Sequence, residues 1–108
     1  MAVSKGFLEF ILDQLSKWGG VSVRRMFGGA GLYRDGKMFG LVANDIIYLK
    51  VDDRTKDKYV VEGSSPLKPF PDRPTVLSYY ELPGDILENP EGFIEWARES
   101  LSIQMKQK

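Results

Sequence analysis

Two turn signals divide the most β-rich part of the chain, and they constrain the fold more than any other feature. Asp35-Gly36 and Asn44-Asp45 are dipeptides typical of two-residue hairpin loops, and apolar, β-compatible residues flank both of them. The residues after these turns, Met38 to Ala43 and Ile46 to Val51, are predicted strands. The residues from Val21 onward form the strand before them. The pattern therefore predicts three antiparallel strands in a meander.

Glycines interrupt the first of these strands at Gly28, Gly29 and Gly31. Within a strand, such residues indicate a bulge or a bend where the backbone curves or another segment approaches closely. A phosphate-binding loop is a second interpretation, but it requires a junction between a strand and a helix followed by Gly-Lys-Ser/Thr. The glycines here lie within β-type sequence and no Gly-Lys-Ser/Thr follows them, so we interpret them as structural.

Helices are predicted on both sides of the meander. In the first, Ser4 is the N-cap and Gly19-Gly20 ends the helix. Its apolar residues recur every three or four positions: Phe7, Leu8, Ile11, Leu12, Leu15 and Trp18. A short helix over residues 54–62 follows the acidic cap Asp52-Asp53 and ends at Gly63.

The last third of the chain begins with a proline-rich connector over residues 64–74. There, only Leu67 to Phe70 could form a short edge strand, and the PxxP spacings are interpreted as a rigid connector. Thr75 to Leu82 is a predicted strand. The final helix starts with Asn89 as N-cap and Pro90 in its first turn.

These elements predict an α+β fold of one domain over residues 1–108. It is a two-layer α/β sandwich with an antiparallel sheet and the order α-β(3)-α-β(2)-α. The 108-residue length suits one self-sufficient core.

The chain contains no His and no Cys. These absences exclude Ser–His–Asp and Cys–His catalysis, disulfides and cysteine zinc sites within this chain. We therefore expect a protein that is not an enzyme and takes no metal or other cofactor. The sequence has no signal-peptide pattern and no apolar run long enough to span a bilayer, so we expect a cytoplasmic protein with no membrane partner.

The net charge of zero conceals two oppositely charged segments. Residues 17–37 carry five basic side chains against one acidic side chain, and residues 72–99 carry two basic against seven acidic ones. The candidate interaction surface is the basic strand region, with Arg24, Arg25, Arg34 and Lys37. The acidic residues Glu88, Glu91, Glu95 and Glu99 lie along one flank of the last helix. Charge balance within the fold, a protein partner and nucleic acid all stay open as explanations.

The segment Arg24 to Tyr33, together with Met38 to Leu41 and Tyr79 to Pro83, resembles the TfoX (Sxy) family N-terminal domain. The positions that carry this motif are Arg25, Met26, Phe27, Gly28, Gly29, Gly31, Tyr33, Gly36, Phe39, Tyr48, Leu49, Lys50, Tyr80 and Pro83. The resemblance implies the fold order given above and no catalytic residues. It also implies a regulator of natural competence that acts through protein contacts alongside a cAMP receptor protein.

The leading hypothesis is a non-enzymatic co-regulator of transcription or competence that acts through protein–protein contacts. The full-length regulators carry a second, helical domain, whereas this chain ends at Lys108. Expected partners are thus a transcription factor or a separate TfoX C-terminal domain. Direct nucleic-acid binding by the basic strand region is the alternative, and a small-ligand site using Tyr48, Lys50 and Tyr80 is the third. A homodimer is also possible, through a sheet edge or the acidic helix.

Overall fold

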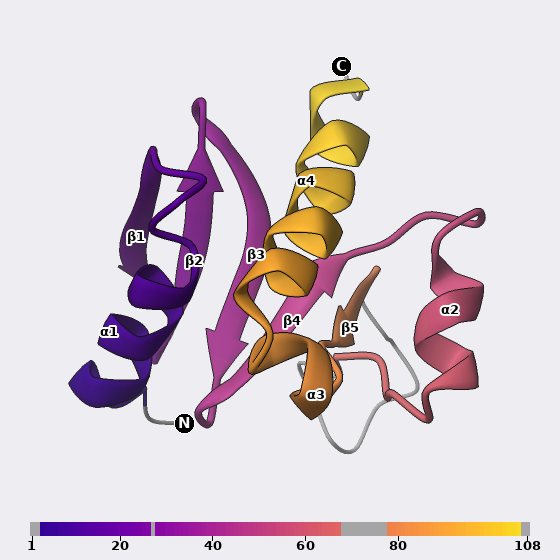
Figure 1. The fold of residues 1–108 in the computed structure, drawn as a ribbon, viewed down its shortest axis with the longest axis horizontal. Coiled ribbons are helices and arrows are strands. Elements are labelled where there is room, and N and C mark those ends of the chain that lie inside the picture. The colour runs from indigo at the N-terminus through magenta and orange to yellow at the C-terminus, as the bar shows by residue number, and fades with distance from the viewer. Residues whose placement is uncertain (1–2, 27, 68–77, 107–108) are drawn as a thin grey trace.

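The computed structural model describes residues 3–26, 28–67 and 78–106. Five strands form one antiparallel sheet in the order β1-β2-β3-β4-β5, so each described strand pairs with its neighbour in the chain (Figure 1). The elements are α1 (Lys5–Gln14), β1 (Val21–Met26), β2 (Gly29–Arg34), β3 (Lys37–Ala43), β4 (Ile46–Lys50), α2 (Lys56–Val61), β5 (Tyr79–Glu81), α3 (Gly84–Leu87) and α4 (Pro90–Lys106).

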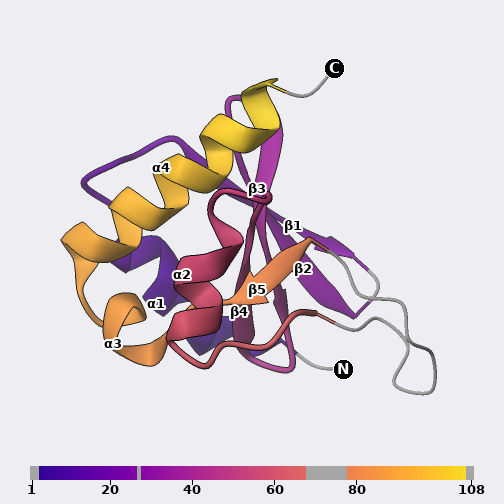
Figure 2. The same cartoon turned by 90° about the vertical axis from the view of Figure 1, so that its right-hand side faces the viewer.

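The described helices all lie on one side of the sheet, which gives the two-layer arrangement expected of the α+β class (Figure 2). The longest helix, α4, packs mainly against β3 and β4. The core between the layers takes large side chains from both, including Ile11, Leu32, Phe39, Leu49, Tyr59 and Phe93, all of them essentially unexposed. The opposite face of the sheet carries no described helix.

The prediction of a single first strand is wrong, because residues 21–34 form two strands, β1 and β2. β1 and β2 pair in antiparallel register from Val21 opposite Arg34 to Met26 opposite Gly29. The chain reverses at Gly28, whose φ of +77° lies in the left-handed region that glycine favours. Glycine is required at position 29 as well, since a Cβ there would overlap the carbonyl oxygen of Val42 on β3. The glycine run thus makes a tight hairpin and a close strand contact.

An irregularity does occur in the sheet, but it lies between β2 and β3. Leu32 pairs with Gly40 and Tyr33 pairs with Met38, so Phe39 is an extra residue on β3. The ring of Phe39 is fully buried and meets Trp18 edge-on, with ring centroids 5.4 Å apart. The bulge therefore turns Phe39 toward the helices.

The predicted helix starts at Ser4 and Asn89 are confirmed. Ser4 Oγ accepts a hydrogen bond from the backbone N–H of Phe7 at 3.1 Å, and α4 begins at Pro90. The first helix ends earlier than expected: its last helical residue is Gln14, and Gly19 and Gly20 follow a separate turn.

The second half of the chain departs from the predicted order. The short helix α2 begins at Lys56 rather than at residue 54, and Asp52 instead accepts hydrogen bonds from the N–H groups of Arg54 and Thr55, both at 3.0 Å. The short helix α3 was not expected. Over the described residues, the order is one helix, four strands, one helix, one strand and two helices, in place of α-β(3)-α-β(2)-α.

The last predicted strand is only partly described. β5 covers Tyr79–Glu81, and Pro66 forms an isolated antiparallel bridge with Tyr80. Three predicted features lie wholly or partly outside the described residues. They are most of the edge strand Leu67 to Phe70, the start of the strand Thr75 to Leu82, and three of the four prolines in the connector.

Candidate interaction surface

The uncovered face of the sheet is where side chains from several strands meet away from the helices. Because strand residues alternate between faces, the pairing of Arg24 with Gly31 and of Gly31 with Leu41 places these three positions on one side of the sheet. Several half-buried apolar and aromatic side chains share that side, and we call five of them the open-face patch: Met26, Tyr33, Met38, Leu41 and Tyr48.

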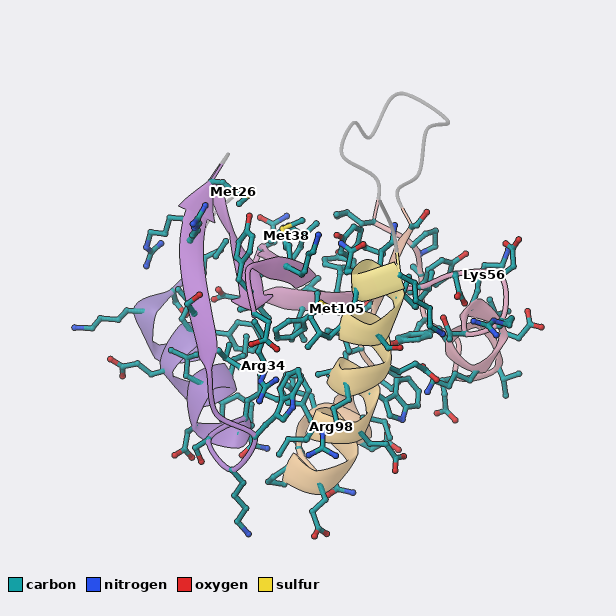
Figure 3. All side chains as sticks on the ribbon, turned by 90° about the horizontal axis from the view of Figure 1, so that it is seen from above. Met26, Arg34, Met38, Lys56, Arg98 and Met105 are labelled. Atoms are coloured by element: carbon teal, nitrogen blue, oxygen red, sulfur yellow. The ribbon has the colours of Figure 1, made fainter. Side chains whose placement is uncertain are left out.

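The centre of the open-face patch lies over Gly31. Three atoms come within 3.0 Å of the point where a Cβ of Gly31 would lie: Met38 Sδ at 2.9 Å, Tyr33 Cε1 at 2.9 Å and Met26 Cε at 3.0 Å. The three side chains thus converge from β1, β2 and β3. Figure 3 shows Met26 and Met38 on the side of the sheet away from the helices, whereas Arg34 points to the helix side. The centre of the patch thus consists of flexible thioethers and an aromatic ring, a composition suited to contact with another surface.

Two cations border the patch. The Cζ atom of Arg24 lies 5.0 Å from the centroid of the Tyr33 ring, and Nζ of Lys50 lies 5.4 Å from that of Tyr79. At these distances a cation is attracted by the face of an aromatic ring. The open face therefore combines apolar area with the positive charges of Arg24 and Lys50 at its border and the negative charge of Glu81 beside Tyr48.

Two tyrosines of this face, Tyr48 and Tyr79, have a raised pKa and stay protonated at neutral pH. Burial raises the pKa of Tyr48, and the nearby negative charge of Glu81 raises it further. Burial also raises the pKa of Tyr79, and the hydrogen bond from Gln104 only partly opposes this effect. These hydroxyl groups are hydrogen-bonding groups rather than bases in this setting.

The four basic residues predicted as one surface do not lie together. Arg24 belongs to the open face, while Arg25 alternates to the helix side, where Nη1 lies 3.4 Å from the carbonyl oxygen of Val3. Lys37 is exposed at the turn between β2 and β3. The predicted basic strand face is thus divided between two faces and a turn.

Arg34 is engaged inside the fold. Its Nε donates to the carbonyl oxygen of Gly19 at 2.7 Å, and Nη2 donates to that of Trp18 at 3.3 Å. The guanidinium also lies over the Trp18 ring, and Nη1 pairs with Asp35 at 3.3 Å. These contacts tie the end of β2 to the chain that follows α1, so Arg34 has a structural role.

The residues of the sequence motif divide in the same way. Phe39, Leu49 and Tyr80 lie on the helix side of the sheet, Gly36 forms the hairpin turn, and Pro83 precedes α3. Phe27 lies outside the described residues. Among the described residues of the motif, those on the open face or at its border are Met26, Gly29, Gly31, Tyr33, Tyr48 and Lys50.

The three residues considered for a small-ligand site do not converge. Tyr48 and Lys50 lie on the open face, but Tyr80 packs on the helix side, where its ring centroid is 6.1 Å from that of Tyr59. Among the described residues, no group of three or more His, Cys, Asp or Glu side chains is placed to hold a metal ion.

Of the acidic residues predicted along the last helix, Glu91 and Glu95 are exposed on α4, but Glu88 is wrongly placed by that prediction, because it is exposed at the C-cap of α3. The remaining residue, Glu99, pairs with Lys58 of α2 at 2.7 Å, and Lys58 also lies 4.2 Å from the centroid of the Trp96 ring. One acidic residue thus contributes to helix packing, while the other three face solvent. No helix in the described segments is long and apolar enough to cross a membrane.

Met38 and Leu41 were not singled out as surface residues from the sequence. Apolar residues in a strand are ordinarily assigned to the core, and the bulge at Phe39 changes which residues of β3 face the helices. Alternation counted from the Asp35-Gly36 turn would have placed Tyr33 and Met38 on one face, because they pair directly across the hairpin.

A comparison with curated proteins finds no match. A comparison with protein-family models matches residues 13–103 to the TfoX N-terminal domain, a span that includes every described strand, α2, α3, the end of α1 and all but the last three residues of α4. The match covers nearly the whole chain and agrees with the resemblance carried by the Arg24 to Tyr33 segment. The chain therefore belongs to the TfoX N-terminal domain family.

Proposed function

We propose that this chain is a non-enzymatic interaction module that regulates transcription by binding a protein partner through its open-face patch. The observation that carries the proposal is a set of partly exposed apolar and aromatic side chains from four strands on the sheet face that no described helix covers. A half-buried patch of Met, Leu and Tyr residues bordered by cations has the composition of a protein-binding surface.

The partner suited to this surface is a protein with an apolar centre and acidic residues around it. Arg24 and Lys50 lie at two sides of the patch, on β1 and β4, and would contact carboxylates at the rim of such a partner. Membership in the TfoX N-terminal domain family supports a role beside a transcription factor or a TfoX C-terminal domain. The lack of His and Cys supports a role without catalysis.

The proposal is tested by reversing the two charges at the border of the patch. In cells that lack the native gene, the Arg24→Glu and Lys50→Glu double variant should reproduce the transcript profile of the deletion. The matched control reverses charge on the helix side with Glu91→Lys and Glu95→Lys, which should restore the wild-type profile. Circular dichroism establishes that both variants are folded. A wild-type profile from the folded Arg24/Lys50 variant would reject the proposal.

Binding of single-stranded nucleic acid is the second candidate function. The stacking of Arg24 on Tyr33, with Tyr48 two strands away, favours it because exposed rings beside cations can stack on bases. Against it stand the zero net charge and the internal use of Arg34. Gel-shift titrations with single-stranded and duplex DNA at low salt test this candidate. Each neutralised phosphate on duplex DNA should contribute a slope of about −0.9 in log K against log salt.

A further inference from the structure

The two edges of the sheet differ, and this difference points to a second contact mode. At the β5 edge, the N–H of Glu81 donates to the carbonyl oxygen of Ser65 at 3.0 Å, and the N–H of Leu67 donates to that of Tyr79 at 2.8 Å. The outer side of β5 is thereby paired. At the other edge, no strand among the described residues pairs with the outer side of β1.

β1 has the geometry of a strand that can accept another. It pairs with β2 at all six positions from Val21 to Met26 without a register shift, so its backbone is extended along its whole length. It contains no proline and no glycine, and it presents backbone N–H and C=O groups along its outer side. An extended peptide could continue the sheet there by main-chain hydrogen bonds.

The side chains of β1 determine which residues an added strand should carry. Arg24 and Arg25 are both exposed, and among the described residues neither forms an ion pair with a carboxylate. They are consecutive, so one points to the open face and the other to the helix side. A paired strand would satisfy both guanidinium groups with two adjacent acidic residues, because its own consecutive side chains alternate in the same way.

A second copy of this chain is the less favourable occupant. Pairing β1 with another β1 would bring four guanidinium groups to the same junction, and like charges across a strand pair are destabilising. We propose that the β1 edge binds an extended acidic segment of a partner protein by strand addition. This inference rests on the proposed protein-binding function and adds its mode and the chemical class of the segment.

The test uses the whole chain and a short blocked peptide of valine and threonine with two adjacent glutamates at its centre. In an amide chemical-shift titration, the glutamate peptide should shift the amides of β1, and hydrogen exchange at those amides should slow. A peptide with glutamines in place of the glutamates should bind about 2- to 30-fold more weakly, since two partly exposed ion pairs are lost. The Arg24→Glu and Arg25→Glu double variant should instead prefer a peptide with two lysines.

A backbone control separates strand addition from simple charge attraction. The glutamate peptide with N-methyl groups at its central residues keeps its charges but loses the N–H donors, so it should not bind. Equal binding by this peptide, or no binding of the parent peptide tighter than about 1 mM, would overturn the inference. Concentration-dependent dimerisation that shifts β1 without peptide would also overturn it, in favour of a second copy.

The outcome is distinguishable from failure of the proposed function. If the peptide does not bind while the Arg24/Lys50 variant still loses regulation, only the strand-addition inference fails. If the peptide binds at β1 but no patch variant alters transcription, the proposed function fails and the edge still recognises acidic strands.

Discussion

The guanidinium of Arg34 lies over the indole ring of Trp18, with Cζ 4.4 Å from the ring centroid. The same Trp18 ring meets Phe39 edge-on at 5.4 Å, so a stack of three side chains joins the turn after α1 to β2 and β3. This stack explains why Arg34 belongs to the fold rather than to the interaction surface.

We predict that Arg34→Lys lowers the free energy of unfolding by about 1–3 kcal/mol. Lysine cannot make both hydrogen bonds to the carbonyl oxygens of Gly19 and Trp18 while stacking on the ring. Urea unfolding followed by circular dichroism measures the change. The control Arg24→Lys should alter stability by less than about 0.5 kcal/mol, since Arg24 is exposed. Equal losses of stability in the two variants would show that the contacts of Arg34 with Trp18 and Gly19 do not stabilise the fold.

The sequence was sufficient where a local signal decides the structure. Asp35 and Gly36 form the predicted hairpin turn, both with positive φ, and Ser4 and Pro90 mark helix starts because capping is a matter of neighbouring residues. The bulge at Phe39 was not predictable, since it depends on contact with Trp18, which is distant in sequence.

The division of the basic residues was missed for a related reason. In one continuous strand, positions 24 and 34 are an even number of residues apart and share a face. The chain reversal at Gly28 breaks that count, so Arg24 lies on the open face and Arg34 on the helix side. Gly28-Gly29 is compatible with a hairpin turn, but no Asn or Asp precedes Gly28, and the β-compatible residues on both sides also suit a bulge within one strand.

Gly29→Ala should destabilise the sheet by at least about 1–3 kcal/mol, because the new Cβ overlaps the backbone carbonyl oxygen of Val42 and one strand must move. The matched control is Gly6→Ala within α1, where a Cβ meets no atom within 4 Å. That change should stabilise the protein by about 0.5–1 kcal/mol through helix propensity. Thermal unfolding of the two variants checks both signs, and a neutral Gly29→Ala would contradict the close contact between β2 and β3.

Tyr59→Phe should raise the free energy of unfolding by about 1 kcal/mol. The Tyr59 ring is fully buried against Trp96, at 4.8 Å between centroids, and its hydroxyl has no hydrogen-bond partner among the described residues. The neighbouring Ser100 hydroxyl donates to the carbonyl oxygen of Lys50 at 2.8 Å.

The matched control for Tyr59→Phe is Tyr79→Phe. This change removes a hydroxyl that accepts from Gln104 at 3.2 Å, and it should lower stability by about 0.5–1.5 kcal/mol. A loss of stability in Tyr59→Phe, measured by urea unfolding, would mean that the Tyr59 hydroxyl is hydrogen-bonded in solution.

The stability should be nearly constant between about pH 6 and 9 and fall above about pH 10. No His or Cys titrates in the lower range. Burial is the main reason that the pKa of Tyr59 lies above its ordinary value of 10.0, and the negative charge of Glu99 adds to the rise. Above pH 10 the unfolded chain loses protons that the folded chain keeps, so the free energy of unfolding falls as pH rises. Tyr59→Phe should flatten this decline; an unchanged slope would contradict the assignment.

The most direct test of the central claim is photo-crosslinking in host cells from position 33, in the open-face patch, compared with position 61. Val61 of α2 is a suitable reference because its apolar side chain is 82% exposed and lies in the helix layer. With a benzophenone side chain in place of Tyr33, we predict one discrete crosslinked protein, lost when Arg24→Glu and Lys50→Glu are added. Position 61 should not yield it. A folded Tyr33 replacement that captures nothing, or only what position 61 captures, would contradict the account.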